Sequence, residues 1–153
     1  DWSSDVCSSD LGEEGENLRT LGAEFGATTG RPRRCGWLDL VALKYSVMVN
    51  GITDIALTKL DVLNSFDQIK VCTSYSLGSK TLKYFPASIE NLEQVTPHFE
   101  TLAGWQCSLD GVSAFDDLPS ATKEYVAFIE KFCGVPVSIL STSPERNDTI
   151  VRA

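Results

Sequence analysis

Three arginines beside a glycine- and threonine-rich run are the residues of this sequence best suited to holding an anion. The stretch FGATTGRPRRCGWLDL, Phe25 to Leu40, concentrates positive charge in a chain whose formal net charge is −8. Each arginine presents a planar fork of donors that matches a carboxylate or phosphate and stays charged at any relevant pH. Residues 31 and 33 share one side if the stretch is extended. Glycines for close backbone approach and neutral hydroxyl donors complete the run: Gly26, Gly30, Thr28 and Thr29.

Two interpretations of this loop follow from the residues alone. A ligand with two or more anionic groups would suit the set of donors. A solvated basic turn that pairs with the protein's own surplus carboxylates would suit it equally well, because acidic residues outnumber basic ones by 21 to 13. Composition leaves both interpretations open.

A second candidate site is the turn Thr58-Lys59-Leu60-Asp61, which follows a predicted strand. One carboxylate there could accept both the N1–H and the N2 amino hydrogens of guanine, a pair of donors that adenine does not offer. By analogy with base-edge readout in DNA, such a contact gives about 1–3 kcal/mol of discrimination. The lysine stem could lie over the base. An ordinary surface turn is the alternative interpretation of these four residues.

A third candidate is Ser141-Thr142-Ser143-Pro144, after the last predicted strand. Open α/β sheets bind ligands at the carboxyl ends of their strands, so this turn could close over a nucleotide. Ser, Thr and Pro are also common in turns without a ligand, and that interpretation stays open as well.

The elements that must position these residues alternate between helix and strand, so the fold class is α/β. Apolar residues at helical spacing, from Leu38 to Val49, predict a helix that ends before Gly51. GITDIALTKLDVL contains a short β-branched run that predicts a buried strand leading into the TKLD turn. IKVCTSYSL and KTLKYFPA alternate around LGSK and predict a hairpin with a glycine in its turn.

The second half of the chain holds the strongest helix pattern. DLPSATKEYVAFIEKFCG carries apolar side chains on one predicted face and ends at Gly134, and Val135 to Leu140 predicts a second buried strand. The predicted face comprises Ala121, Tyr125, Phe128, Ile129 and Phe132. Residues 89–104 include Pro97 and show little periodicity, which predicts mostly loop with a short helix; His98 is expected on the surface of that loop.

Composition excludes several classes of protein. A length of 153 residues suits about one domain. A net-acidic chain is poorly suited to following a nucleic-acid backbone, and the sequence has no run of 18 apolar residues that would span a membrane. An odd, scattered set of cysteines at no metal-ligand spacing indicates reduced thiols in a cytoplasmic protein: Cys7, Cys35, Cys72, Cys107 and Cys133. Residues 1–11 are Ser/Asp-rich and are interpreted as a junction segment foreign to the rest of the chain.

Six sequence blocks, in order, resemble the C-terminal part of the adenylosuccinate synthetase family over about residues 12–152. They are EFGATTGRPRRCGWLDL, ALTKLDVL, YFPA, DDLP, GVPV and STSPER, with AGW at Ala103 to Trp105 as a further match. The resemblance implies a P-loop NTPase-like fold with a mixed sheet and flanking helices, of which residues 12–153 would form the C-terminal part of a single domain. It also implies ligation of IMP and L-aspartate with GTP and Mg²⁺, in AMP biosynthesis, by a cytoplasmic homodimer.

The resemblance implies roles for the three candidate sites. The loop Ala27, Thr28, Thr29, Gly30, Arg31, Pro32 and Arg33 would bind aspartate and IMP. Arg31 would reach aspartate and the IMP ribose, and Arg33 would serve aspartate close to the GTP phosphates, whereas Arg34 is expected to be structural. The GTP-binding residues would be Arg33, Lys59, Leu60, Asp61, Ser141, Thr142 and Ser143, with Asp61 as the base reader. Ser143 stands where the family usually has glycine, which places a Cβ close to the base.

The family's phosphate loop, catalytic aspartate and histidine, and magnesium ligands belong to its N-terminal region. No matching pattern occurs in this sequence, so no catalytic residue and no metal ligand is assigned to it. The chain by itself is therefore expected to be inactive. A non-catalytic guanine-nucleotide-binding or interaction module is the alternative function, and an unrelated GTPase with a TKLD turn is a third.

Overall fold

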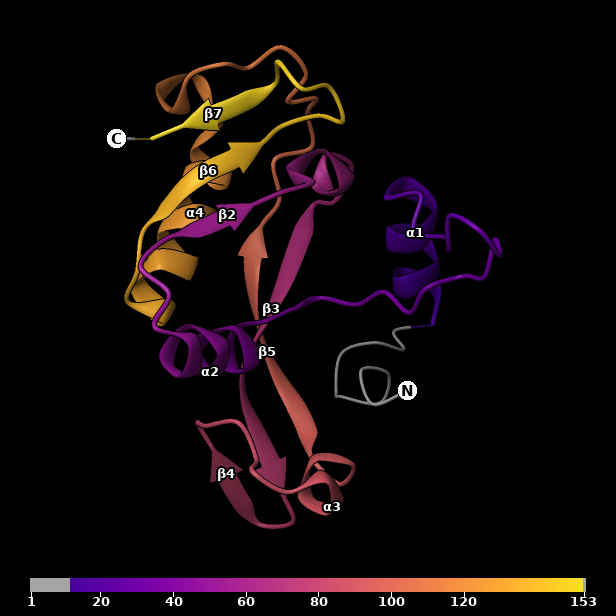
Figure 1. Ribbon diagram of the computed structural model, residues 1–153, viewed down its shortest axis with the longest axis vertical. Coiled ribbons are helices and arrows are strands. Elements are labelled where there is room, and N and C mark those ends of the chain that lie inside the picture. Colours follow the sequence, from indigo (N-terminus) through magenta and orange to yellow (C-terminus); the bar gives the residue numbers. More distant parts are fainter. Residues whose placement is uncertain (1–11, 153) are drawn as a thin grey trace. The chain divides into compact units, whose positions relative to one another are not determined.

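Two mixed sheets, with helices beside them, organise the chain in a computed structural model that describes residues 12–152 (Figure 1). The predicted α/β class is confirmed. The chain divides into two units. The described residues of the first are 12–42 and Lys70–Glu100, and those of the second are Leu43–Ile69 and 101–152. The predicted junction segment, residues 1–11, lies outside the described residues.

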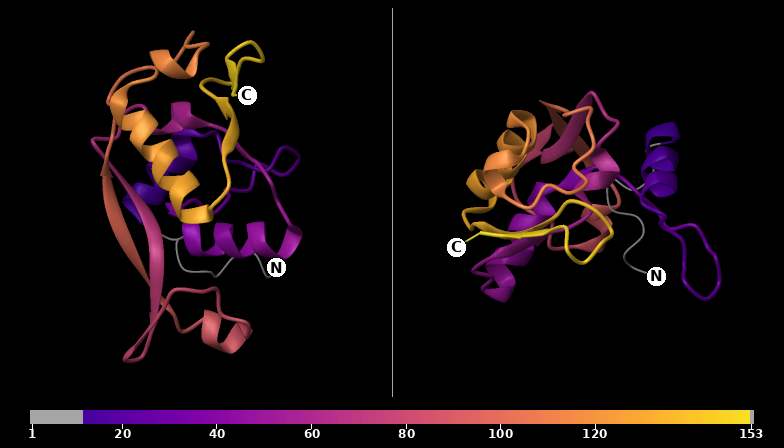
Figure 2. Two further views of the ribbon diagram at one scale, coloured as in Figure 1. Left: turned by 90° about the vertical axis from the view of Figure 1, so that its left-hand side faces the viewer. Right: turned by 90° about the horizontal axis from the view of Figure 1, so that it is seen from above.

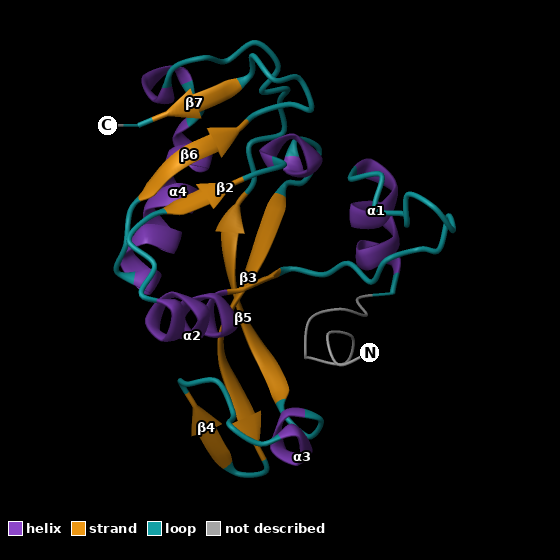
Figure 3. Ribbon diagram, viewed as in Figure 1, coloured by secondary structure: helices purple, strands orange, loops and turns teal. Residues whose placement is uncertain are grey.

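The first sheet is built around a hairpin. β1 (Leu38–Asp39) pairs in parallel with β3 (Gln68–Leu77). β3 pairs in antiparallel fashion with β4 (Lys80–Leu82), and both strands are labelled in Figure 3. A two-residue turn joins β3 to β4, and Gly78 in it has φ 59°, a backbone conformation that favours glycine. The predicted hairpin with its glycine turn is confirmed. β5 (Thr96–Ala103) also pairs with β3.

β5 corrects the prediction that residues 89–104 are mostly loop. α3 (Ile89–Leu92) is the expected short helix, but Thr96–Ala103 is a strand, and exposed His98 belongs to it rather than to a loop. Pro97 and Phe99 alternate with exposed neighbours, which is the period of a half-buried strand. Proline is tolerated near the start of an edge strand, so Pro97 hid this pattern without interrupting it.

The second sheet carries two of the three candidate turns. β2 (Ile55–Leu57) pairs in parallel with β6 (Val137–Ser141), which pairs in antiparallel fashion with β7 (Thr149–Val151). α4 (Ser120–Cys133) packs against β6 and is seen from another side in Figure 2. Val137 and Leu140 of β6 are fully buried, as is Ile129 of α4, so these side chains form the centre of this core.

α4 begins and ends where the sequence predicts, but its most buried face differs. Tyr125 and Ile129 are buried as predicted, whereas Ala121, Phe128 and Phe132 are only half-buried. The remaining buried positions are Thr122, Val126 and Cys133. The Phe132 ring is half-buried because it lies under the Lys44 ammonium, 5.3 Å from the ring centroid, instead of in the packed face.

Four further elements complete the described chain. α1 (Glu13–Leu21) has no counterpart in the sequence-based prediction. α2 (Leu40–Asn50) is the predicted helix and ends before Gly51, but it begins at Leu40 because Leu38 belongs to β1. The Asp39 carboxylate caps α2, because its Oδ1 accepts from the main-chain N–H of both Val41 and Ala42 at 3.0 Å. Two 3₁₀ turns are also present: η1 (Leu60–Leu63) and η2 (Phe115–Asp117). None of the helices within residues 12–152 has the length and apolar character needed to cross a membrane.

Gly104, in the AGW segment, lies against the main chain of the segment that follows η1. Its N–H donates to the Asp67 carbonyl at 2.8 Å, and a Cβ built on it would lie 2.0 Å from the Phe66 carbonyl oxygen. The next residue, Trp105, is buried; its Nε1 donates to Asn64 Oδ1 at 2.9 Å, and its ring packs on that of Tyr125. Only glycine fits this approach.

We predict that Gly104→Ala destabilises the chain by about 3 kcal/mol, because overpacking against rigid backbone forces the main chain apart. Chemical denaturation of the chain, followed by tryptophan fluorescence, measures the loss. Gly111→Ala is the matched control, since Gly111 has φ 76° with nothing within 4 Å of a built Cβ. Its left-handed backbone makes the control cost about 1 kcal/mol. Equal losses for the two variants would contradict the packing role of Gly104.

Candidate functional site

The arginine loop is closed at its base by main-chain hydrogen bonds. The Gly26 N–H donates to the Arg31 carbonyl at 2.8 Å, and the Arg33 N–H donates to the Glu24 carbonyl at 3.0 Å. Gly30 has φ 64° and its N–H donates to the Gly26 carbonyl at 2.8 Å, so the tip folds back on itself. Residues 27–34 are all exposed. The loop therefore presents its polar groups to solvent from a defined base.

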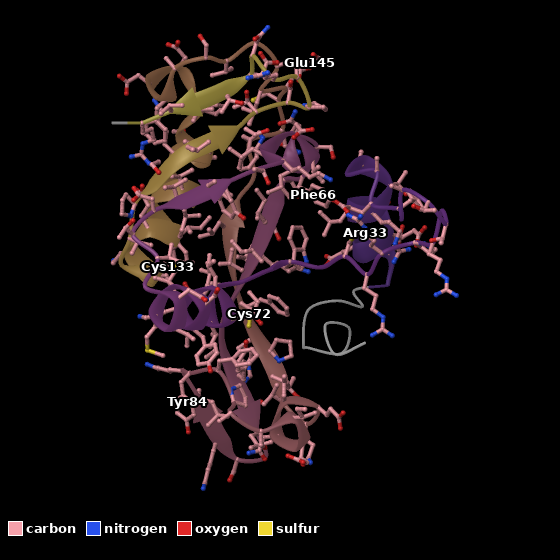
Figure 4. All side chains as sticks on the ribbon, in the orientation of Figure 1. Arg33, Phe66, Cys72, Tyr84, Cys133 and Glu145 are labelled. Carbon is pink, nitrogen blue, oxygen red and sulfur yellow. The ribbon has the colours of Figure 1, made fainter. Side chains whose placement is uncertain are left out.

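The arginines in this loop differ in their partners. Arg33, labelled in Figure 4, forms an ion pair through Nη1 with Glu24 Oε2 at 2.8 Å. Its carbonyl accepts from Arg19 Nε of α1 at 2.6 Å. The guanidinium of Arg31 makes no hydrogen bond or ion pair within residues 12–152, and its main-chain N–H donates to Thr29 Oγ1 at 3.4 Å. Within residues 12–152 the Arg31 guanidinium is therefore unpaired, whereas that of Arg33 is paired with Glu24.

Glu14 of α1 anchors the segment that carries the loop. Its Oε1 accepts from Lys70 Nζ of β3 at 2.7 Å, and its Oε2 accepts from Trp37 Nε1 at 2.8 Å. The hydrogen bond from Lys70, and to a lesser extent that from Trp37, lowers the pKa of the Glu14 carboxyl. The Lys70 ammonium also lies 6.0 Å from the centroid of the Trp37 ring. The Glu14–Lys70 ion pair and the Lys70–Trp37 contact thus hold the segments before and after the loop to β3 of the first sheet.

The two other candidate turns lie next to each other at one edge of the second sheet. β2 and β6 are parallel with Leu57 opposite Leu140, so Thr58 and Ser141 leave neighbouring strands at the same end. Lys59 then adopts φ 62° and ψ 38°, a left-handed conformation that is uncommon for a residue with a side chain, and η1 begins directly after it. β6 contacts η1. The structure therefore brings TKLD and STSP together.

Burial divides the predicted nucleotide-binding residues into two groups. Leu60, Thr142 and Ser143 are buried, so contact between these residues and a ligand would come from the main chain. Lys59 is exposed, and Asp61 and Ser141 are half-buried, so their side chains are accessible. The Ser141 hydroxyl donates to the Ser143 carbonyl at 3.0 Å.

Asn64 supports the turn that carries Asp61. Its main-chain N–H donates to the Asp61 carbonyl at 3.1 Å, and its side-chain oxygen accepts from buried Trp105. The AGW block pointed to Trp105, but no pattern pointed to Asn64. An asparagine that closes a 3₁₀ turn is a recognisable turn residue, but its tryptophan partner, 41 residues away, is not readable from the sequence.

Other residues near the two sites were not predicted either. Glu24 pairs with Arg33, and Asp148 accepts hydrogen bonds from Thr142 and Ser143. Within residues 12–152, His, Cys, Asp and Glu form no group of three or more that could hold a metal ion. Cys72, Cys107 and Cys133 are free thiols, and burial raises the pKa of Cys133; Cys7 lies outside the described residues.

Comparison with known proteins relates this chain to one protein family. The family model described as adenylosuccinate synthetase matches residues 3–150. Adenylosuccinate synthetase of Aquifex aeolicus is 55% identical over 139 residues, which cover 91% of this chain and 32% of that protein. The Salinibacter ruber synthetase is 52% identical over the same length and coverage. The chain thus spans about a third of the length of the curated relatives that it matches.

A solved structure agrees with this result. The structure of fully ligated adenylosuccinate synthetase from Plasmodium falciparum matches with a TM-score of 0.91 and 34% identity, covering 98% of this chain and 36% of that one. The family model covers nearly the whole chain, and the solved synthetase structure matches its fold in addition to its sequence. The chain therefore belongs to the adenylosuccinate synthetase family.

Proposed function

We propose that this chain provides the aspartate-binding loop and the guanine-reading turns of an adenylosuccinate synthetase. In the reaction that the family name implies, GTP phosphorylates the 6-oxygen of IMP, and the amino group of aspartate then displaces phosphate to form adenylosuccinate. The chain's part in this chemistry is to bind and orient. Holding the aspartate amine near C6 of the activated IMP is mainly a task of positioning. We further propose that the complete protein is a cytoplasmic homodimer.

The observation that carries this proposal is the parallel pairing of β2 with β6. It places the TKLD turn beside the STSP turn, with the half-buried Asp61 carboxylate at the edge where open α/β sheets bind ligands. In our proposal this carboxylate accepts the N1–H and N2 hydrogens of guanine. The stem of Lys59 covers the base, and the main chain at Leu60 and Ser141–Ser143 completes the pocket.

The arginine loop supports the aspartate half of the proposal. L-Aspartate carries two carboxylates, and a bidentate arginine–carboxylate contact is stronger than a neutral hydrogen bond. We propose that Arg31, whose guanidinium has no partner within residues 12–152, binds the aspartate carboxylate and the IMP ribose. Arg33 would join it and reach the GTP phosphates once it leaves Glu24. The exposed Thr28 and Thr29 hydroxyls supply further donors.

Within residues 12–152, His, Cys, Asp and Glu form no group of three or more, so we assign no residue of this chain to the magnesium ion that the family implies. No step of this proposal is routed through the ion. We propose that its ligands, and the groups that transfer protons, come from the parts of the synthetase that this chain does not match.

We predict that the 153-residue chain alone forms no adenylosuccinate, because it is proposed to bind and orient rather than to start the reaction. A completed synthetase, in which residues 12–152 replace the matching segment of the Aquifex aeolicus relative, is expected to form adenylosuccinate from IMP, GTP and aspartate. The absorbance change of the purine measures turnover, and the unmodified relative is the control. Turnover by the chain alone, or an inactive completed synthetase beside an active relative, would contradict the proposal.

Arg31→Lys in the completed synthetase is predicted to raise the KM for aspartate roughly tenfold or more, because a lysine cannot form the bidentate contact. Arg34→Lys is the matched control within the same loop and should change that KM by no more than about twofold, as surface substitutions usually do. Steady-state kinetics with aspartate varied at saturating IMP and GTP measures the KM for aspartate of both variants. Similar effects of the two variants would refute the assignment of Arg31.

Asp61→Asn is predicted to weaken the preference for guanine by a factor of about 10 to 100, because an amide cannot accept both guanine hydrogens. Xanthine has a carbonyl in place of the N2 amino group, so XTP should gain relative to GTP. The measurement is the ratio of kcat/KM for GTP to that for XTP in the completed synthetase. Asp54→Asn, at an exposed aspartate upstream of β2, is the control. If Asp61→Asn leaves the ratio of kcat/KM for GTP to that for XTP unchanged, Asp61 does not recognise the base.

A further inference from the structure

We propose that Asp148 is a positioning residue for the guanine-reading turn, and that it sets the affinity for GTP through Thr142 and Ser143 without touching the nucleotide. This inference rests on the proposed function of that turn. Asp148 lies in the loop between β6 and β7, directly before β7, and Ser141 pairs with Thr149 across the base of that loop. Glu145, in the same loop, is labelled in Figure 4.

Asp148 holds Thr142 through its main chain. The Asp148 carbonyl accepts from the Thr142 N–H at 3.0 Å and from Thr142 Oγ1 at 3.1 Å. The same hydroxyl lies 3.3 Å from the Val112 carbonyl, and Thr142 is fully buried. A fully buried side chain with these contacts cannot turn toward a ligand, so Thr142 offers a nucleotide only its main chain.

The Asp148 carboxylate holds Ser143 through its side chain. Ser143 Oγ donates to Asp148 Oδ2 at 2.6 Å and accepts from the Glu145 N–H at 3.0 Å. A short hydrogen bond from a hydroxyl to a carboxylate is charge-assisted and stronger than a neutral one. The Ser143 residue is 5% exposed. The two bonds leave this hydroxyl facing into the loop rather than toward a base.

Asp148 therefore joins the start of the loop to its end at two successive residues. A pocket that reads a base with main-chain groups depends on where that main chain is held, because those groups cannot adjust as a flexible side chain does. The Asp148 carboxylate also explains how the loop accommodates the serine side chain at position 143. Its hydroxyl is bound inside the loop, and the Ser143 carbonyl is fixed in turn by the Ser141 hydroxyl at 3.0 Å.

The test measures steady-state kinetics of Asp148→Ala in the completed synthetase. We expect the KM for GTP to rise about tenfold, the loss typical of one hydrogen bond to a charged group. The kcat at saturating GTP, and the KM values for IMP and aspartate, should stay unchanged. Asp148→Asn keeps an acceptor oxygen and should restore most of the affinity. Ser143→Ala removes the other partner of the pair and should raise the KM for GTP in the same way.

Asn147→Ala is the matched control, because Asn147 is an exposed neighbour in the same loop whose side chain has no hydrogen bond within the described residues. If Asp148→Ala lowers only the thermal midpoint or kcat and leaves the KM for GTP unchanged, the positioning role is overturned. The same holds if Ser143→Ala leaves that KM unchanged. An inactive completed synthetase, or an Asp61→Asn variant that keeps its full preference for guanine, would instead overturn the proposed function and this inference with it.

Discussion

The parallel pairing of β2 with β6 is the constraint on which the proposed guanine-binding turns depend. Leu57 lies opposite Leu140, and each strand ends in a polar turn within one or two residues of this pair. Parallel strands end at the same edge of a sheet, so the pairing sets the two turns side by side although they are far apart in the chain. α4 covers β6, and buried Val137 and Leu140 fix that register against the core.

The TKLD turn exposes a side chain, whereas the STSP turn can offer mainly its main chain. Lys59, in its left-handed conformation, sends the chain into η1, where Leu60 is buried and Asp61 is accessible. On the other side, buried Thr142 and Ser143 turn their hydroxyls inward. The proposed guanine pocket would combine the accessible Asp61 carboxylate, which selects donors, with main-chain groups of the neighbouring turn, which fix the shape. A left-handed lysine costs about 1–2 kcal/mol, a strain that is typical of functional sites.

Sequence patterns predicted most of the elements but not the contacts that hold the site. α2, α4, the β3–β4 hairpin and the strands before both turns follow from periodicity and glycine positions. β5 was missed because Pro97 resembles a strand breaker, although proline is compatible with the start of an edge strand. The partnerships of Trp105 with Asn64 and of Glu14 with Lys70 join residues 41 and 56 positions apart, and only the tertiary fold brings them together.

The arginine loop shows why composition left two interpretations open. In a chain of net charge −8, nearby carboxylates compete with any ligand for the arginines, and Glu24 pairs with Arg33. This pair does not argue against ligand binding. The Arg33 side chain is 60% exposed, and an exposed ion pair contributes only about 0–1 kcal/mol, so a carboxylate bound in bidentate fashion can replace Glu24 at small cost. In the proposed function a bound carboxylate would take the place of Glu24 at Arg33, whereas Arg31 would need no such exchange. The ion pair with Glu24 fits the interpretation as a basic turn, whereas the proposed aspartate-binding role treats the same loop as an anion site.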